Sequence, residues 1–238
     1  MARKRIRKKD LKKPDEFITL STRIVAWSQD NTRLVMGAIG AITLLILVVS
    51  GVFVFKAQRE ARARALYEAA LALYPASAAG EANAAEYAEV AAKLEEVKSR
   101  YGATAVGTNA SVDLGNVYFQ IGDYDKAISC YTDFLGRTDL ENTFHAPVLE
   151  SLGEAYEAKG SYEDALRVYQ RLARESAPVY QTQAQLYLGR VYEAMGDQSQ
   201  AMNHYENYLN ANPVTLFGES IRVKLMRWRK TADLKEQG

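Results

Sequence analysis

The chain has 238 residues, with 30 Lys and Arg against 29 Asp and Glu and a single cysteine. This length allows one domain plus a tail, and one cysteine excludes an intrachain disulfide framework. The formal net charge of +1 hides an uneven distribution, because the first 33 residues alone carry an excess of basic side chains.

Residues 1–33 form a basic segment, for which we expect a role as a topology signal. Its acidic residues are Asp10, Asp15, Glu16 and Asp30, and its basic residues are Arg3, Lys4, Arg5, Arg7, Lys8, Lys9, Lys12, Lys13, Arg23 and Arg33. The resulting +6 leaves −5 for the rest of the chain, which favours a cytoplasmic N-terminus. Two alternatives remain open. The basic residues closest to the apolar run 34–55 lie mostly after it, which argues for the opposite orientation of the chain. A basic tail can also contact RNA or anionic lipid.

Within this segment, apolar residues recur at helical spacing at Phe17, Leu20, Ile24 and Trp27. The pattern predicts a short amphipathic helix with Trp27 near the headgroup layer of a membrane. Binding of a partner protein is the alternative role for this helix.

Residues 34–55 are 22 consecutive residues without a charge. As a helix they span about 33 Å, enough for the hydrocarbon core of a bilayer. A cleaved signal peptide is the rival interpretation, but its apolar part has only about 7–15 residues. We therefore predict one transmembrane helix, with the domain that follows it translocated across the membrane.

Residues 56–103 are rich in alanine. They predict a helix over 58–74, a break at "PASAAGEAN" and a second helix over 84–101. We expect this pair to be an atypical first helical hairpin of the repeat array that follows in residues 104–213, because the terminal units of such arrays commonly depart from the pattern of the others.

Residues 104–213 contain one pattern three times. The Leu-Gly pairs end at Gly115, Gly153 and Gly189, which are 38 and 36 residues apart. After each pair come a second glycine (Gly122, Gly160, Gly196), an alanine (Ala127, Ala165, Ala201) and a tyrosine (Tyr131, Tyr169, Tyr205). A fixed period in this range indicates stacked helical hairpins, each turning at its second glycine in the left-handed conformation. In the second copy we expect Ser161 to cap the following helix.

These positions resemble the tetratricopeptide repeat, which is usually about 34 residues long. Together with the transmembrane helix predicted from residues 34–55, the resemblance implies an all-α fold: one transmembrane helix followed by a tetratricopeptide-repeat α-solenoid. The longer offsets imply insertions, which we expect to lengthen the connections 137–142 and 175–180. Residues 214–238 predict a C-terminal capping helix, with Thr215 at its start and Phe217, Ile221, Leu225 and Trp228 on its buried face.

No arrangement of residues indicates catalysis, a cofactor or a metal. We expect Cys130 to be a small core residue, and neither His145 nor His204 has a partner at metal-ligand spacing. The prediction is therefore a non-catalytic protein without a small-molecule substrate or a nucleic-acid partner.

Tetratricopeptide arrays usually bind partners on the surface formed by the first helix of each repeat, and the resemblance implies which residues line it. They are Asn109, Asn116, Phe119, Gln120, Glu150, Glu154, Glu157, Gln183, Leu186, Arg190 and Glu193. Glu150, Glu154 and Glu157 share one helical face and would favour basic or neutral segments, although a solvated polar face is an equal alternative.

The order of tail, membrane helix, alanine-rich hairpin and repeats resembles the bacterial ancillary SecYEG translocon subunit family. That resemblance implies a single-pass inner-membrane protein whose partners are translocon subunits, a periplasmic chaperone and emerging unfolded chains. A scaffold for envelope assembly or cell-division complexes is the alternative function.

Overall fold

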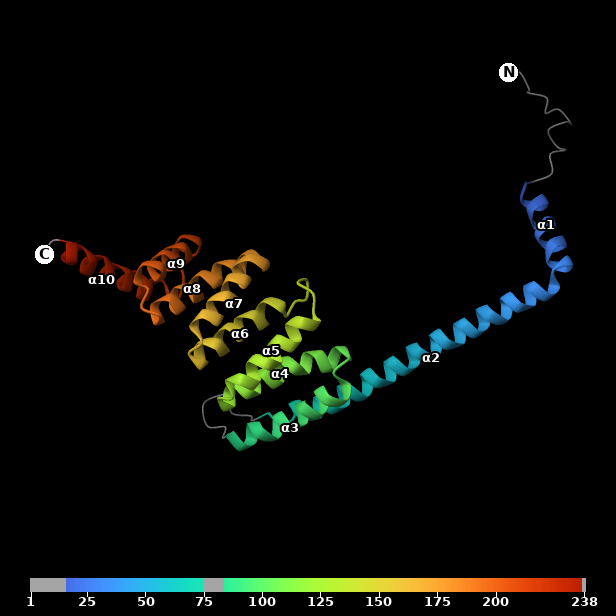
Figure 1. Ribbon diagram of the computed structural model, residues 1–238, viewed down its shortest axis with the longest axis horizontal. Helices are drawn as coiled ribbons and strands as arrows, with labels where there is room; N and C mark the ends of the chain where they lie inside the picture. Colours follow the sequence, from blue (N-terminus) through green and yellow to red (C-terminus); the bar gives the residue numbers. More distant parts are fainter. Residues whose placement is uncertain (1–15, 75–83, 237–238) are drawn as a thin grey trace, which may run out of the picture. The chain divides into compact units, whose positions relative to one another are not determined.

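The computed structural model describes residues 16–74 and 84–236 (Figure 1), and the basic tail before residue 16 lies outside them. The described part contains ten helices and no strand, which confirms the all-α fold class. It divides into two compact units, Met1–Gln58 and Arg59–Gly238.

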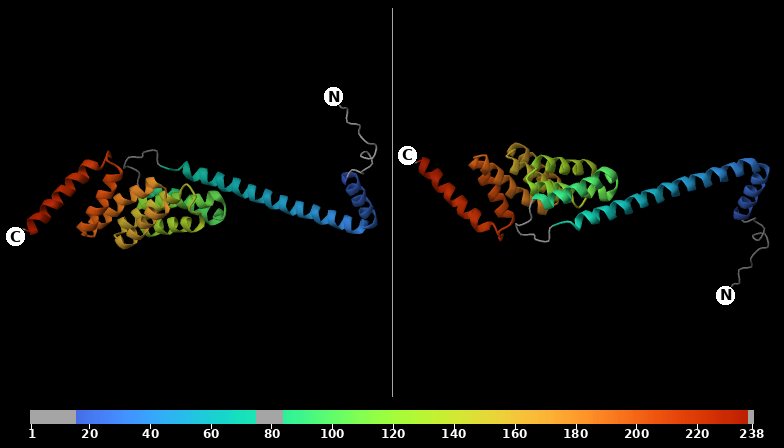
Figure 2. Two further views of the ribbon diagram at one scale, coloured as in Figure 1. Left: turned by 90° about the horizontal axis from the view of Figure 1, so that it is seen from above. Right: turned by 90° about the horizontal axis from the view of Figure 1, so that it is seen from below.

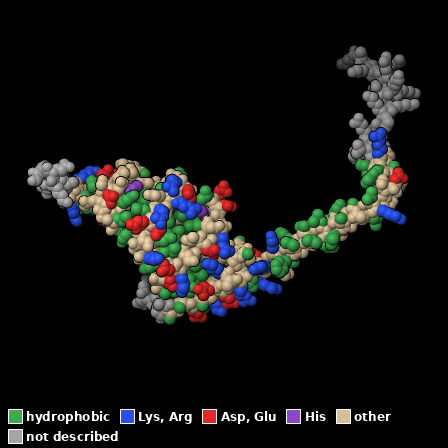
Figure 3. Space-filling view, in the orientation of Figure 1, with side chains coloured by type: hydrophobic (Ala, Val, Ile, Leu, Met, Phe, Trp, Pro, Cys, Tyr) green, Lys and Arg blue, Asp and Glu red, His purple; other side chains and the backbone are tan. Residues whose placement is uncertain are grey.

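The first unit contains α1 (Glu16–Asp30) and the whole apolar run 34–55 of α2 (Thr32–Leu71). The amphipathic helix is thus present as α1; Ile24 and Trp27 are exposed, and the side chains of Phe17 and Leu20 lie outside the description. From Leu34 to Phe55, the large hydrophobic side chains of α2 other than Val35 are at least half exposed, and Figure 3 shows apolar atoms along this helix. In the described part of the chain, α2 is the one helix long and apolar enough to cross a membrane.

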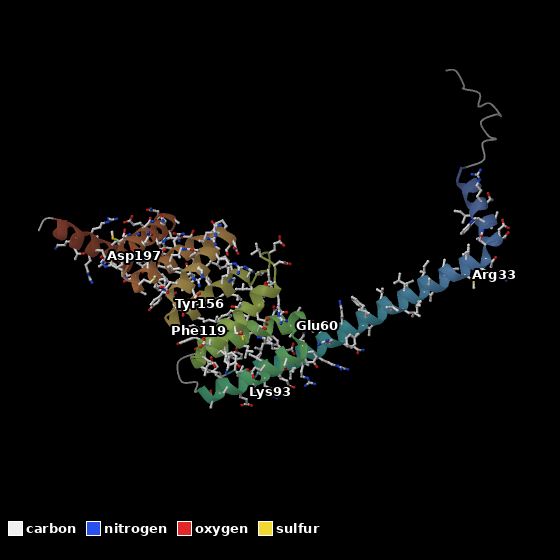
Figure 4. The ribbon with its side chains drawn as sticks, viewed as in Figure 1. Arg33, Glu60, Lys93, Phe119, Tyr156 and Asp197 are labelled. Carbon is white, nitrogen blue, oxygen red and sulfur yellow. The ribbon has the colours of Figure 1, made fainter. Side chains whose placement is uncertain are left out.

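The second unit begins at Arg59, inside α2, and this helix continues without interruption to Leu71. Ala63 and Ala70 are fully buried there. Ala70 belongs to the same core cluster as residues of α3 (Ala84–Tyr101) and α4 (Ala105–Ile121). The Glu60 carboxylate (Figure 4) accepts the N–H groups of Ala105 at 3.2 Å and Val106 at 2.9 Å. These N–H groups lie in the first turn of α4, where they have no acceptor within the helix. The Glu60 carboxylate therefore caps α4 from a segment 45 residues earlier in the chain.

The three repeats are the helix pairs α4 and α5 (Tyr124–Arg137), α6 (His145–Lys159) and α7 (Tyr162–Glu175), and α8 (Pro178–Ala194) and α9 (Gln198–Ala211). The helices stack in chain order, so that α4 packs between α3 and α5, α6 between α5 and α7, and α8 between α7 and α9 (Figures 1 and 2). This confirms the predicted hairpins and their order.

Glycines make each hairpin possible in two ways. Gly122, Gly160 and Gly196 have φ of 85°, 80° and 81°, the left-handed conformation predicted for the turns. At the other glycine of each repeat, the ring of the tyrosine from the second helix lies directly against the backbone. The pairs are Gly115 with Tyr131, Gly153 with Tyr169 and Gly189 with Tyr205.

Two expectations about helix ends need correction. Ser161 stands at the N-cap of α7 but its side chain makes no capping hydrogen bond, whereas Asp123 and Asp197 do cap α5 and α9. Between α7 and α8 only residues 176–177 intervene, so the second insertion does not lengthen that connection. Pro178 instead opens α8, because a proline costs nothing at the first helical position, where its missing N–H would have no partner.

The C-terminal helix is α10 (Gly218–Glu236). Ile221 and Leu225 are buried as predicted, and Trp228 is partly buried beside Tyr205. The expectation for Phe217 was wrong, because this residue precedes the first turn of the helix and remains 49% exposed.

Candidate functional site

The candidate site is the surface formed by the side chains of α4, α6 and α8 that do not face the second helices; we call it the first-helix face. The structure leaves four of the predicted residues exposed: Asn109, Asn116, Gln120 and Arg190. The other seven are partly buried: Phe119, Glu150, Glu154, Glu157, Gln183, Leu186 and Glu193.

The repeated tyrosines connect the core to this face. The hydroxyl of Tyr131 donates to Asn116 at 2.8 Å, that of Tyr169 to Glu157 at 2.6 Å and that of Tyr205 to Glu193 at 2.6 Å. Each ring thus packs on the glycine of its own hairpin while its hydroxyl fixes one polar side chain on the face. Repeat positions alone could not predict these bonds, because the acceptor is one residue after the glycine in the first repeat and four after it in the others.

Glu157 is neutralised by a cation from the next repeat. The guanidinium of Arg190 on α8 donates to both carboxylate oxygens of Glu157, from Nη2 at 2.7 Å and from Nε at 3.0 Å. The same guanidinium lies 5.1 Å from the ring of Tyr187, which stacks on Tyr169 at 4.8 Å. A two-bond Arg–carboxylate pair is among the stronger polar contacts in proteins. Glu157 therefore holds α6 and α8 together and does not add an open negative charge to the face.

Glu150 and Glu154 remain as the acidic part of the face. Burial raises the pKa of both carboxyl groups, because the charged form loses hydration there. Glu150 accepts a long hydrogen bond of 3.4 Å from Tyr187, and Arg190 partly offsets the pKa shift of Glu154. These two carboxylates are incompletely compensated within the chain, so a partner that supplies a cation or a hydrogen-bond donor would stabilise them.

The sequence analysis missed the part that α10 plays at the end of this face. The Lys224 ammonium lies 2.6 Å and 2.7 Å from the two carboxylate oxygens of Glu193. It also lies 5.4 Å from the ring centre of Tyr205 and 5.8 Å from that of Trp228. Lys224 follows Arg190 by 34 residues, the usual length of the repeat. This spacing is the sequence signal that could have predicted the role of Lys224.

The two apolar residues of the predicted site are partly used by the fold. Phe119, labelled in Figure 4, packs edge-on against Tyr124 with ring centres 5.5 Å apart. Tyr156, also labelled there, occupies the C-terminal part of α6 as Phe119 does that of α4, and both pack partly against the core. Leu186 packs against the smaller core cluster around Tyr205 and Tyr208. The face therefore offers small apolar areas between polar side chains.

Away from this face, α3, α4 and α5 line an open pocket of about 760 Å³, and Cys130 is one of its lining residues. Cys130 is buried, as predicted, and burial raises the pKa of its thiol, which disfavours the reactive thiolate. Among the described residues, no three His, Cys, Asp or Glu side chains gather as a metal site would require.

Family models support the repeats. Models described as tetratricopeptide repeat match residues 112–180 and 183–213. No functionally curated protein matches the chain.

Solved structures agree on the fold. A tetratricopeptide repeat protein from Parabacteroides merdae superposes with a TM-score of 0.57 at 18% identity, over 74% of this chain and 63% of its own, which is less than two thirds of its length. A Podospora anserina protein with nearly identical TPR-like repeats gives a TM-score of 0.54 at 18% identity, over 75% of this chain and 90% of its own. At these identities the likeness concerns the fold alone.

Proposed function

We propose that this chain, which carries tetratricopeptide repeats over residues 112–180 and 183–213, is a non-catalytic, membrane-anchored adaptor that binds other proteins on its first-helix face. Tetratricopeptide repeats imply a role in protein interaction. The observation that carries the membrane part is the continuity of α2, whose exposed apolar segment and buried Ala63 and Ala70 belong to one helix.

The anchor contributes to binding through concentration. A domain tethered to a membrane meets other membrane proteins at a high effective concentration, so that weak contacts suffice. Phe119 and Leu186 supply apolar contact area, and Glu150 and Glu154 supply a preference for basic or neutral segments over acidic ones.

The finer proposal is an association with the SecYEG translocon and a periplasmic chaperone, with the N-terminus in the cytoplasm and the repeats in the periplasm of a bacterium. It rests on the order of segments and on the charge of residues 1–33. External protease on spheroplasts should digest the repeats and spare the tail. Protection of the repeats would reverse the topology and remove the translocon proposal with it.

Partner binding can be tested without disturbing the Arg190–Glu157 pair. The test variant is Glu150→Gln with Glu154→Gln, and the matched control is Glu89→Gln with Glu163→Gln, at exposed positions of α3 and α7 off the first-helix face. Full-length proteins are purified from membranes in mild detergent at several salt concentrations, and translocon subunits are quantified by mass spectrometry.

We expect the test variant to recover less partner than the wild type, with a weaker dependence on salt, while the control matches the wild type. Equal recovery of translocon subunits by all three proteins would exclude the two carboxylates as contacts. Recovery of envelope-assembly or cell-division proteins in place of translocon subunits would favour the scaffold function.

A further inference from the structure

The first-helix face continues onto the last turns of α2. The hydroxyl of Tyr67 on α2 donates to the carboxylate of Asp113 on α4 at 2.5 Å, and Glu60 of α2 caps the same helix α4. Glu60 and Tyr67 therefore mark the side of α2 that faces α4. Arg59, which donates to the backbone carbonyl of Arg100 at 3.0 Å, marks the side that faces α3.

Arg64 lies beside the residues of α2 that contact α4, on the edge turned away from α3. It follows Glu60 by four residues and precedes Tyr67 by three, and side chains at these spacings are neighbours on a helix surface. At 3.6 residues per turn, Arg64 and Arg59 point about 140° apart. Leu71, which comes seven residues after Arg64, lies on the same side and is 36% exposed. Arg64 and Leu71 thus form one more row of the first-helix face, ahead of the row that α4 supplies.

Arg64 is the uncompensated charge of this row. Its side chain is exposed, and among the described residues it forms no hydrogen bond or ion pair. The carboxylate of Glu60, one turn earlier, is engaged by N–H groups of α4, and Glu68, one turn later, forms no ion pair with Arg64 in the described part of the chain. The guanidinium therefore has free donors, in the planar arrangement that binds a carboxylate.

Charge changes sign along the face from α2 to α6. The row of α2 is positive at Arg64. The row of α4 presents the exposed neutral amides of Asn109 and Asn116. The row of α6 is negative at Glu150 and Glu154, where burial raises the pKa of both carboxyl groups. A bound segment is therefore offered a cation at one end of this stretch and two carboxylates at the other.

We propose that the first-helix face takes an extended segment of a partner protein, which carries an acidic residue for Arg64 and a basic residue for Glu150 and Glu154. This inference rests on the adaptor function proposed above, since it names what the same face binds. The side-chain amides of Asn109 and Asn116 both donate and accept hydrogen bonds, so they match the main-chain groups of an extended segment that crosses α4.

Helix packing sets the distance between the two charges of the partner. Packed helices lie about 8–10 Å apart, so α2 and α6, which both contact α4, are about 16–20 Å apart. An extended chain advances about 3.3 Å per residue. The acidic and the basic residue of the segment should therefore lie about five or six positions apart.

The test uses the full-length protein in mild detergent and three fluorescent peptides of about 12 residues, about 40 Å when extended. The first peptide carries an aspartate and a lysine about six positions apart. The second has a lysine in place of that aspartate, and the third has the aspartate and the lysine at adjacent positions. Fluorescence anisotropy measures binding, and circular dichroism checks helical content.

Arg64→Glu is the test variant. Arg62→Glu is the matched control, because Arg62 is an exposed residue of α2 that points about 160° away from Arg64. We expect Arg64→Glu to weaken the first peptide by about fivefold and to bind the second more tightly than the wild type does, because an attraction and a repulsion are exchanged. The control should match the wild type with both peptides, and helical content should not change. The third peptide should bind the wild type about threefold more weakly than the first, because one of its charges cannot reach its partner.

Equal binding of the first peptide by Arg64→Glu and the wild type, or no binding of that peptide, would overturn the proposal. If Glu150→Gln with Glu154→Gln weakens the first peptide and Arg64→Glu does not, the face still binds proteins and only the α2 row fails. An absence of protein partners in the membrane co-purification is the separate result that would refute the proposed function. A dimer that Arg64→Glu dissociates would make the occupant a second copy, and binding of phosphatidylglycerol through Arg64 without any change in peptide binding would make it a lipid headgroup; either result overturns a partner segment.

Discussion

Replacement of Gly189 by alanine tests the packing on which the repeats depend. A Cβ atom at this position would lie 2.7 Å from two ring carbons of Tyr205, well inside the usual contact distance. The ring cannot easily move aside, because Tyr205 is buried and its hydroxyl donates to Glu193 at 2.6 Å. Overpacking costs about 1–3 kcal/mol and loss of a hydrogen bond to a charged acceptor about 1.5–3 kcal/mol, against a gain of about 1 kcal/mol in helix propensity. We expect a net loss of about 1.5–5 kcal/mol in the free energy of unfolding.

Gly136→Ala is the control. Gly136 also lies in a helix, α5, but no atom lies within 4 Å of an added Cβ, so this variant should gain about 0.5–1 kcal/mol. Urea unfolding of the full-length protein in detergent, followed by circular dichroism, measures both midpoints. If Gly189→Ala is as stable as the wild type or gains stability as Gly136→Ala does, the tyrosine-on-glycine contact does not constrain the hairpin and the reasoning is wrong.

Ala165→Leu should cost about 1–3 kcal/mol of unfolding free energy because Ala165 is fully buried, whereas Ala158→Leu at an exposed position should cost much less; equal shifts of the thermal midpoint would contradict this. Burial lowers the pKa of His145, and the positive charge of Arg171 lowers it further. Between this lowered pKa and the ordinary value near 6.5, the unfolded state binds more protons than the folded state. The free energy of unfolding should therefore fall as pH falls through this window. His145→Gln should flatten the profile there, and an unchanged profile would assign the loss to other groups. Burial raises the pKa of Glu150, so its protonated form favours folding at low pH and that stability is lost as pH rises through the raised pKa. Glu150→Gln should therefore be at least as stable as the wild type at pH 7, and a clear loss there would show that the carboxylate is well compensated.

The sequence by itself determined the order of elements and the period of the array. Local chemistry decides these features: a left-handed turn strongly favours Gly160, close helix approach requires a small residue such as Ala165, and a long charge-free run is compatible with one helix through a membrane. The long apolar helix and the repeats could be predicted for that reason. So could the burial of Cys130, since it lies on the apolar side of a repeat helix.

Only the tertiary structure decided how the candidate site is charged. Glu150, Glu154 and Glu157 look alike in sequence, but Arg190 arrives from a different repeat and neutralises only Glu157. The cap that Glu60 provides for α4 spans 45 residues and likewise follows from stacking. Helical spacing determines which side chains share a face, whereas the partners of a polar group depend on which helices pack together and on how deeply each group is buried. Both the packing of the helices and the depth of burial depend on the assembled array, so they cannot be predicted from the sequence of a single repeat.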